Sequence, residues 1–319
     1  MRALEERLQH TPILPEEEPA EVFHYTTVEG LHGILATRKL WATDVRYLND
    51  RSEFIYSDDL VRQVGTSLCA GLGPLFDFSE MLNKNFLDIF DCYVSCFCED
   101  GDLLSQWRAY SRQGAGYAIG FDVPRLRALH SADAGAMLGR IVYDQAAQLE
   151  LLRESLQSAL RPILGRSLID EFSRLMDETS KRAAGLSAEE VKQLIENTRP
   201  IVTQRMLELI SGPVQEAHMR LVAIRAFMKF PRFSEEREWR FVVLRPAESA
   251  GAVVFGTGRG VLVPRFAVDL GDTDSLPINR IIVGPTLDPE AAMRSVRRLL
   301  ASLGMKRVEV EVSPIPLRA

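Results

Sequence analysis

Cysteine is scarce in this sequence: four cysteines occur among 319 residues. Three of them, Cys92, Cys96 and Cys98, lie in one apolar run and share one face of a predicted strand. A structural zinc site needs a tetrahedral ligand set, usually with paired Cys-x-x-Cys turns, so we interpret these cysteines as small buried residues and predict no metal site. The spacing also gives no disulfide framework, which indicates a reducing compartment and leads us to expect a cytoplasmic protein.

Long hydrophobic runs and an excess of positive charge are also missing. No apolar stretch reaches the ~18 residues that a membrane-spanning helix needs. Residues 1–20 lack the apolar core of a signal peptide, so we interpret them as a charged leader. With 38 basic and 44 acidic residues, the formal net charge is −6. This balance excludes an overall basic field for a long nucleic acid, though not a local basic groove.

Several familiar catalytic motifs are absent as well. The chain has no phosphate-binding P-loop, no His-Glu-x-x-His zinc motif, no Gly-x-Ser-x-Gly nucleophile elbow and no convincing Ser-His-Asp set. The glycine-rich segment Gly256–Gly260 is not a dinucleotide fingerprint, because its spacing differs and no helix follows it.

The hydrophobic periodicity predicts a mixed α+β protein with a long helical insertion. Strand-like segments dominate residues 21–144 and 229–319, and we assign both to one α+β domain. Residues 145–228 follow a helical pattern, with a break near Gly185. Apolar stripes in this insertion favour packing on the sheet or a homodimer contact over a ligand site. The stripe residues are Leu151, Leu152, Leu156 and Leu160, then Met206, Leu207 and Ile210.

Capping residues mark the starts of the predicted helices. Thr26 or Thr27 precedes a helix over residues 28–38, with Glu29 spaced from Thr26 as in a capping box. A further short strand is expected over residues 140–144. Other caps are expected at Asp50, Asp102, Ser187 and Asp288.

Polar side chains stand out at two strand ends. The run His24–Thr27 closes the first predicted strand, where a histidine is most often a hydrogen-bonded structural group. A functional role for His24 requires partners from elsewhere, and Glu236 and Glu238 are the best candidates. On a strand, Glu238 and Arg240 share one face while Trp239 anchors the other in the core. The alternative is a solvated, charged strand end.

Two aromatic residues, Trp107 and Tyr110, lie three positions apart and are therefore neighbours on a predicted helix. Aromatic residues at this spacing usually belong to a core. Alternatively, they provide a face on which a flat ring stacks.

Five motifs follow one another in a recognisable order: FHYTTVEGLHGIL, LWATDVRYLNDRSE, CYVSCFCEDGDLLSQWRAYSRQGAGYAIGFD, FSEEREWRFVV and INRIIVGP. Together they resemble a bacterial family of unknown function, domain-of-unknown-function family 2971 (DUF2971). The resemblance covers most of the chain outside the leader and the insertion. The family label implies no activity.

The same order is similar, more distantly, to the ADP-ribosyltransferase superfamily, whose members split NAD in a cleft between two small sheets. This resemblance implies a split mixed or antiparallel sheet core with NAD as the substrate. It matches His24, with Tyr25 and Thr26 beside it, to the residues that hold the NAD ribose. It matches Tyr110, with Trp107 on the same helix face, to the aromatic residue that stacks on nicotinamide.

The resemblance also matches the superfamily's catalytic glutamate to Glu238, with Glu236 as the alternative. Arg240 would pair either with Glu238 or with a phosphate of NAD. One branch has a second tyrosine on the middle strand, where this chain has Cys96. That departure removes one half of the expected nicotinamide sandwich.

Cleavage of the nicotinamide–ribose bond develops positive charge on the sugar, which a fixed carboxylate stabilises. We therefore expect an ADP-ribosyltransferase-like enzyme that transfers to a protein, a nucleic acid or a small molecule, by analogy a toxin or antiphage effector. The alternatives are a non-catalytic module that senses a nucleotide and a helical interaction protein that works through residues 145–228.

Overall fold

The computed structural model describes most of the chain. Two expectations lie outside the described residues: the cap at Asp50 and the side-chain stripe at Met206, Leu207 and Ile210. The described residues are 6, 8, 11–48, 52–69, 90–110, 116–132, 135–164, 174, 177–178, 180–246, 253–258 and 260–316, without the side chains at 52–55, 69, 130–132, 162–164, 188, 195 and 198–210.

The chain divides into two compact units. The first consists of Met1–Tyr56, Leu87–Ala147 and Arg225–Ala319, and the second of Ser57–Phe86 and Gln148–Ile224. The second unit therefore takes in residues 148–224, close to the predicted insertion. It also takes in residues 57–86, which the sequence pattern places in the α+β domain.

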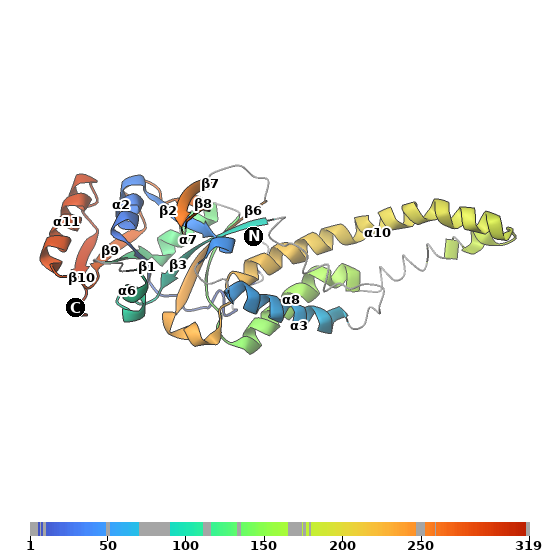
Figure 1. Cartoon of the computed structure of the whole chain (residues 1–319), viewed down its shortest axis with the longest axis horizontal. Coiled ribbons are helices and arrows are strands. Elements are labelled where there is room, and N and C mark those ends of the chain that lie inside the picture. Colours follow the sequence, from blue (N-terminus) through green and yellow to red (C-terminus); the bar gives the residue numbers. More distant parts are fainter. Residues whose placement is uncertain are drawn as a thin grey trace. The chain divides into compact units, whose positions relative to one another are not determined.

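All of the described strands belong to the first unit and form one ten-stranded sheet. The sheet is mixed, because β9 and β10 pair in parallel while the other pairs run antiparallel. The prediction of a mixed α+β fold is thus confirmed (Figure 1). The strands are β1 (Glu21–Thr26), β2 (Lys39–Asp44), β3 (Phe90–Cys98), β4 (Tyr117–Asp122), β5 (Ala136–Arg140), β6 (Glu238–Pro246), β7 (Val253–Gly258), β8 (Val261–Asp269), β9 (Ile278–Val283) and β10 (Glu309–Val312).

Strand β3 is the centre of the sheet, and the sheet splits along one of its edges. β6 pairs with β3 over its whole length. A strand has only two edges, so β1 and β2 must share the other one. β1 pairs there at Cys98 and β2 at Tyr93 and Val94. The backbone of β3 between these points, around Cys96, has no strand partner on that edge among the described residues.

The two faces of β6 separate apolar from ionic side chains. Trp239, Phe241 and Val243 are buried in the main core of the first unit. Glu238 and Arg240 lie on the opposite face, where they contact each other. The two-residue period of a strand predicts this division, and the structure confirms it.

One strand lies earlier in the chain than the sequence suggests. The structure has β5 at Ala136–Arg140, so the strand expected over residues 140–144 is wrong. The Ile141 amide still donates to the Glu238 carbonyl of β6, and the Val142 amide then donates to the Phe227 carbonyl instead. An apolar, β-branched run such as Ile-Val-Tyr favours extended structure, but its sequence does not specify which segment it pairs with.

Three of the expected caps are present, at Thr27, Ser187 and Asp288. The capping box from Thr26 is wrong because Thr27 is the cap, and Asp102 lies two residues before α6, where its carboxylate accepts the Trp107 indole instead.

Thr27 caps α2, since its hydroxyl accepts the Gly30 amide at 3.3 Å. Asp288 caps α11 by accepting the Ala291 amide at 2.9 Å. The helical elements are α2 (Val28–Thr37), the 3₁₀ turn η1 (Val45–Tyr47), α3 (Ser52–Cys69), α6 (Leu104–Tyr110), α7 (Val123–Ala132), α8 (Gln145–Leu164), α10 (Ala188–Arg225), the 3₁₀ turn η2 (Pro231–Glu236) and α11 (Pro289–Ser302).

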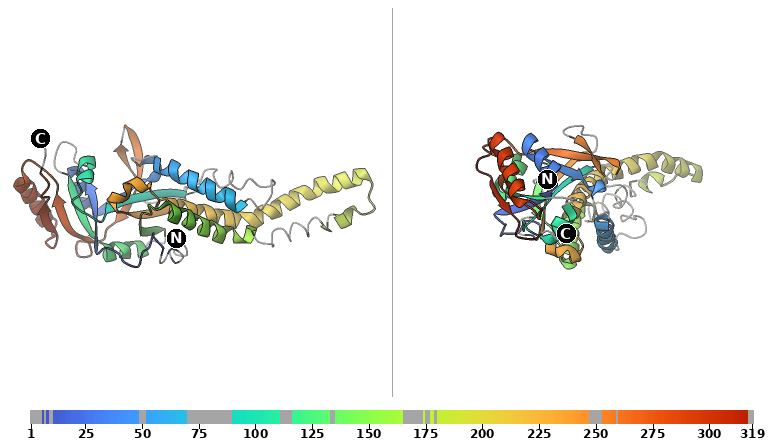
Figure 2. Two further views of the ribbon diagram at one scale, coloured as in Figure 1. Left: turned by 90° about the horizontal axis from the view of Figure 1, so that it is seen from below. Right: turned by 60° about the vertical axis from the view of Figure 1, so that its left-hand side comes forward.

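The second unit is helical. Figures 1 and 2 show α8 running alongside the C-terminal part of α10, and the Arg220 guanidinium on α10 donates to the Ser155 carbonyl on α8. The leucines of the predicted α8 stripe are buried, so this stripe is a packing surface. Among the described helices, none combines the length and the apolar character that a membrane crossing requires.

Two glycines of α2 provide a matched test of this packing. An added Cβ at Gly30 would lie 1.9 Å from the Thr26 hydroxyl oxygen, whereas one at Gly33 would have nothing within 4 Å. Thr26 is β-branched and buried, so it has little room to move. We expect Gly30→Ala to lower the unfolding free energy by about 1–3 kcal/mol. Gly33→Ala should raise it by up to ~1 kcal/mol through helix propensity.

Urea unfolding monitored by circular dichroism measures both effects. Equal stability of the two variants would contradict the close contact between α2 and the end of β1.

Candidate functional site

His24 fills the gap where β1 and β2 part from β3. Its Nδ1 lies 2.9 Å from the Cys96 carbonyl oxygen. A carbonyl only accepts, so Nδ1 carries the proton and, in the neutral ring, Nε2 is left as an acceptor. Burial lowers the pKa of His24, and the bond to Cys96 opposes this only partly. The imidazole thus replaces a missing ladder hydrogen bond and presents a lone pair on its other nitrogen.

The two residues after His24 make local structural contacts. The Tyr25 hydroxyl donates to the Asp100 carbonyl at 2.9 Å and accepts the Leu103 amide at 2.8 Å, which fixes the chain entering α6. Thr26 is buried against Gly30 of α2. Both residues position the His24 strand end.

The two aromatic residues of α6 differ in exposure. Trp107 is 2% exposed, and its indole donates to the Asp102 carboxylate at 2.7 Å. Trp107 is therefore a core residue. Its hydrogen bond also gives the Asp102 carboxylate a side-chain partner on α6. Tyr110 is partly exposed, with its ring 6.5 Å from that of Tyr25 at an interplanar angle of 29°. Of the pair, Tyr110 has the more accessible ring.

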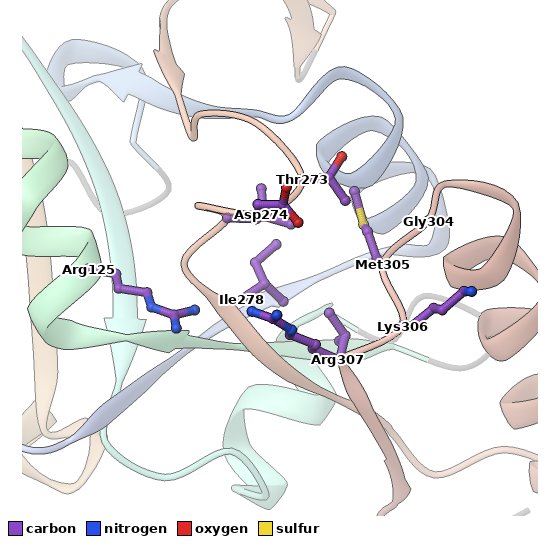
Figure 3. Close-up of a pocket in the computed structure, with 10 residues that line it drawn as sticks. Arg125, Thr273, Asp274, Ile278, Gly304, Met305, Lys306 and Arg307 are labelled. Carbon is purple, nitrogen blue, oxygen red and sulfur yellow. The ribbon is translucent and has the colours of Figure 1, made fainter.

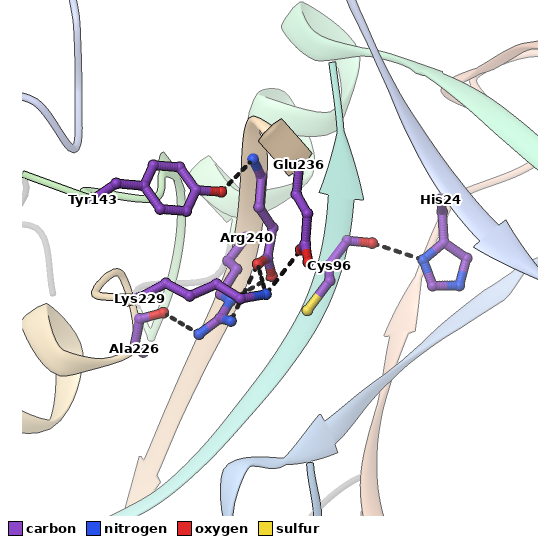
Figure 4. A network of polar contacts seen from close by, with 8 residues as sticks. His24, Cys96, Tyr143, Ala226, Lys229, Glu236 and Arg240 are labelled. Carbon is purple, nitrogen blue, oxygen red and sulfur yellow. Dashed lines mark hydrogen bonds and ion pairs between the residues drawn. The ribbon is translucent and has the colours of Figure 1, made fainter. Parts of the chain in front are cut away.

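A buried ionic cluster surrounds Glu238, the first residue of β6 (Figure 4). Its carboxylate lies 2.7 Å from Arg240 Nε and 2.8 Å from Lys229 Nζ. Its backbone amide donates to the Tyr143 hydroxyl at 3.0 Å. The side chain is only 3% exposed. Burial alone would raise the pKa of Glu238, but the charges of Arg240 and Lys229 outweigh it and hold the pKa at about 2.

Arg240 is enclosed in the same cluster. Its side chain is 3% exposed, and besides Glu238 it donates to the Ala226 carbonyl at 2.9 Å. Of the two partners that the sequence left open for Arg240, the structure contains the ion pair with Glu238.

Glu236 approaches the cluster from η2. Its carboxylate lies 2.8 Å from Lys229 Nζ, so one ammonium joins both glutamates. Arg237 between them has φ 40°, a left-handed conformation that is costly for a residue with a side chain. This turn directs Glu236 and Glu238 toward the same lysine. Glu236 is 19% exposed and therefore more accessible than Glu238.

Cys96 links the histidine to the acid. Its carbonyl accepts from His24, and its thiol hydrogen-bonds the Glu238 carboxylate. Burial raises the pKa of the Cys96 thiol well above its usual range, which keeps it a neutral donor. Tyr110 lies within electrostatic reach of Cys96 and Glu238. Residues distant in sequence thus gather around one position of β3.

The described residues contain no group of three His, Cys, Asp or Glu side chains that could hold a metal ion. Cys92 and Cys98 are buried on the same side of β3 as Cys96. Burial raises the pKa of both thiols, which disfavours the thiolate that a metal would need.

Sequence reasoning missed Lys229 and Tyr143. Lys229 is buried, with its ammonium 5.1 Å from the centre of the Phe233 ring. The signal in the sequence is a lone lysine between apolar residues in AFMKFP, followed by three glutamates within four positions. A buried lysine requires a carboxylate partner, which those glutamates supply. Tyr143 gave no comparable signal.

One segment of the chain matches a known protein family. Residues 106–241 match the family described as Protein of unknown function (DUF2971). This confirms the resemblance to DUF2971 over that range. The DUF2971 segment includes Tyr110, Tyr143, Lys229 and both glutamates, while His24 and Cys96 precede it. Searches of curated proteins and of solved structures find no significant match.

The protonation of His24 provides a test of the strand gap. The folded pKa lies below the ordinary 6.5, so the unfolded chain binds the extra proton first as the pH falls. The contribution of this group to stability therefore declines below that pH. Nitrogen-15 NMR of the ring should show a neutral, Nδ1-protonated imidazole at pH 6.5. An Nε2-protonated neutral ring would contradict the bond to Cys96, and half protonation at this pH would contradict the lowering of the pKa by burial.

Removal of one charge from the ionic cluster should be costly. Glu238→Gln keeps the shape of the side chain but removes the negative charge that the buried Arg240 guanidinium and the Lys229 ammonium contact. We expect the unfolding free energy to fall by about 3–5 kcal/mol. Glu235→Gln is the matched control, because Glu235 belongs to the same segment and is exposed. The control should remain within ~0.5 kcal/mol of wild type in urea unfolding. A similarly small change in Glu238→Gln would mean that the cluster is solvated.

Proposed function

We propose that this protein is an NAD-cleaving enzyme of the ADP-ribosyltransferase type. The observation that carries the proposal is the arrangement around Cys96, where His24 from β1 and Glu238 from β6 approach the same residue of β3. Tyr110 adds a partly exposed ring nearby. His24 contacts the carbonyl of Cys96 and Glu238 contacts its thiol, beside the point where β1 and β2 part from β3. Members of this superfamily bind NAD in a cleft between two small sheets.

Each group suits one part of the reaction. The Glu238 carboxylate, ionised at neutral pH, would stabilise the positive charge that develops on the ribose as the bond to nicotinamide breaks. The Nε2 lone pair of His24 would accept a hydrogen bond from a ribose hydroxyl, and Tyr110 would stack on nicotinamide. The acceptor's nucleophilic atom then bonds to the ribose C1′. Its proton passes to a carboxylate or to water, and nicotinamide leaves neutral.

The two glutamates differ in what they offer. Glu238 is held rigidly by Arg240 and Lys229, which favours a fixed electrostatic role. Glu236 is more exposed and shares Lys229, which favours contact with an acceptor or a ribose hydroxyl. We assign the charge-stabilising role to Glu238 and keep Glu236 as the alternative. Arg240 then acts as a positioning residue for Glu238, because its guanidinium is already bonded within the cluster.

One observation favours a second candidate function. Two cations neutralise Glu238, and its side chain is almost completely enclosed. A carboxylate satisfied in this way has less charge to offer a developing cation than an unpaired one. A non-catalytic module that senses a nucleotide beside His24 and Tyr110 fits this enclosure. Binding without turnover is its signature.

Nicotinamide release from NAD, combined with isothermal titration of NAD, separates the two functions. Glu238→Asp keeps the charge that Arg240 and Lys229 require but withdraws the carboxylate by one methylene group. We expect release to fall by roughly 10²-fold, with the Kd for NAD nearly unchanged. Glu235→Asp is the matched control and should behave as wild type. Circular dichroism confirms that each variant is folded.

The other outcomes are equally decisive. If wild type binds NAD but releases no nicotinamide, the sensor describes the protein. If Glu236→Gln abolishes release while Glu238→Asp does not, Glu236 carries the reaction. If wild type does not bind NAD, the NAD-cleaving function and an NAD-sensing function are both wrong.

A further inference from the structure

A hollow outside the Glu238 cluster lies between α7, the loop before β9 and the loop before β10. Its volume is about 210 Å³, below the ~300 Å³ at which pockets for drug-sized ligands begin. Any ligand that fits within it is therefore small. None of the residues that line it belongs to the His24–Glu238 arrangement.

Two arginines face each other across this hollow. Figure 3 shows the side chains of Arg125, from the first turn of α7, and Arg307, from the loop before β10, pointing toward one another, whereas Lys306 points away. Within the part of the chain that the structure describes, neither arginine side chain forms an ion pair or a hydrogen bond. Two facing guanidinium groups repel each other, and an anion between them would relieve this repulsion.

The floor of the hollow is apolar. Leu276, Ile278 and Met305 line it and are each 4% exposed, as members of the main core. A group that is charged at one end and apolar at the other would contact both the arginines and this floor. An acid, Asp274, also lines the hollow. Its negative charge opposes an anion and sets a limit on the affinity.

The two loops that form the walls are internally braced. Asp272 accepts the amides of Asp274 and Ser275 and the Ser275 hydroxyl. In the other loop Gly304 has φ 75°, and the Met305 amide donates to the Leu300 carbonyl at 2.9 Å. Because these loops are already ordered, binding a ligand does not carry the entropic cost of ordering them, which favours affinity.

We propose that this hollow binds the phosphate group of a small phosphate monoester, with Arg125 and Arg307 contacting the phosphate and the apolar floor contacting the carbon part. Guanidinium groups bind phosphate through paired N–H···O bonds, and two of them match its double negative charge. The positive pair stands out in a chain whose net charge is −6.

Isothermal titration of the full-length chain tests the site with three probes. Phenyl phosphate presents both the anion and a ring, inorganic phosphate the anion alone, and benzyl alcohol the ring alone. We expect phenyl phosphate to bind at millimolar concentration or below, inorganic phosphate more weakly, and benzyl alcohol not at all. If inorganic phosphate binds as tightly as phenyl phosphate, the apolar floor plays no part and the monoester assignment is wrong. If neither phosphate binds, the site does not exist.

Variants assign the binding to the hollow. The double variant Arg125→Gln with Arg307→Gln should weaken the binding of phenyl phosphate at least tenfold. The matched control, Arg294→Gln with Arg298→Gln, removes the same charge from exposed positions of α11 and should bind as wild type. If both double variants lose the same affinity for phenyl phosphate, the loss comes from the change in net charge, and the proposed site is wrong.

A third variant changes the affinity in the opposite direction. Asp274→Asn removes the opposing negative charge and should tighten the binding of phenyl phosphate severalfold. Unchanged or weaker binding in this variant would place the anion elsewhere. All of the substituted side chains are exposed, so the variants should keep the unfolding midpoint of wild type.

Discussion

The ion pairs of Glu238 are the interaction on which the candidate site depends. A carboxylate that is 3% exposed carries its charge only because Arg240 and Lys229 contact it directly. Lys229 also binds Glu236, and Tyr143 accepts the Glu238 amide, so one buried charge fixes the start of β6, the end of η2 and the segment after α10. Without its partners this carboxylate would be neutral, and the chemistry proposed for it would have no negative charge.

The split of the sheet explains the histidine on the first strand. Between its contacts with β1 and β2, β3 exposes the Cys96 carbonyl to the gap, and a backbone acceptor in a partly buried position needs a donor. The Nδ1–H of His24 supplies it. The same bond leaves Nε2 as the acceptor of the neutral ring. The need for a donor to the Cys96 carbonyl thus creates a group, Nε2 of His24, that can bind a ligand. Cys96 then joins this group to the acid through its thiol.

Strand periodicity and capping residues predicted much of this arrangement. They did not predict which distant segments pair with one another. The two-residue period placed Glu238 beside Arg240 and opposite Trp239. Of the two threonines predicted as caps, Thr26 and Thr27, the structure has Thr27 at the start of α2. The strand expected over residues 140–144 was wrong because pairing depends on distant segments, which a local pattern does not encode. Lys229 carried a signal, a lone lysine between apolar residues, but the sequence did not show which of the following glutamates it would bind. Trp107 and Tyr110 have equal spacing signals, and only the packed structure distinguishes the buried ring from the accessible one.

The charge state of Glu238 tests this account most directly. Carbon-13 NMR of the side-chain carboxyl groups, with the Glu238 signal assigned from its loss in Glu238→Gln, follows protonation as the pH is lowered. The account predicts that Glu238 stays ionised through 4.5, the ordinary pKa of a glutamate, and begins to protonate only as the pH approaches about 2. A midpoint at or above 4.5 would show that Arg240 and Lys229 do not hold the charge, and the site described here would not exist in solution.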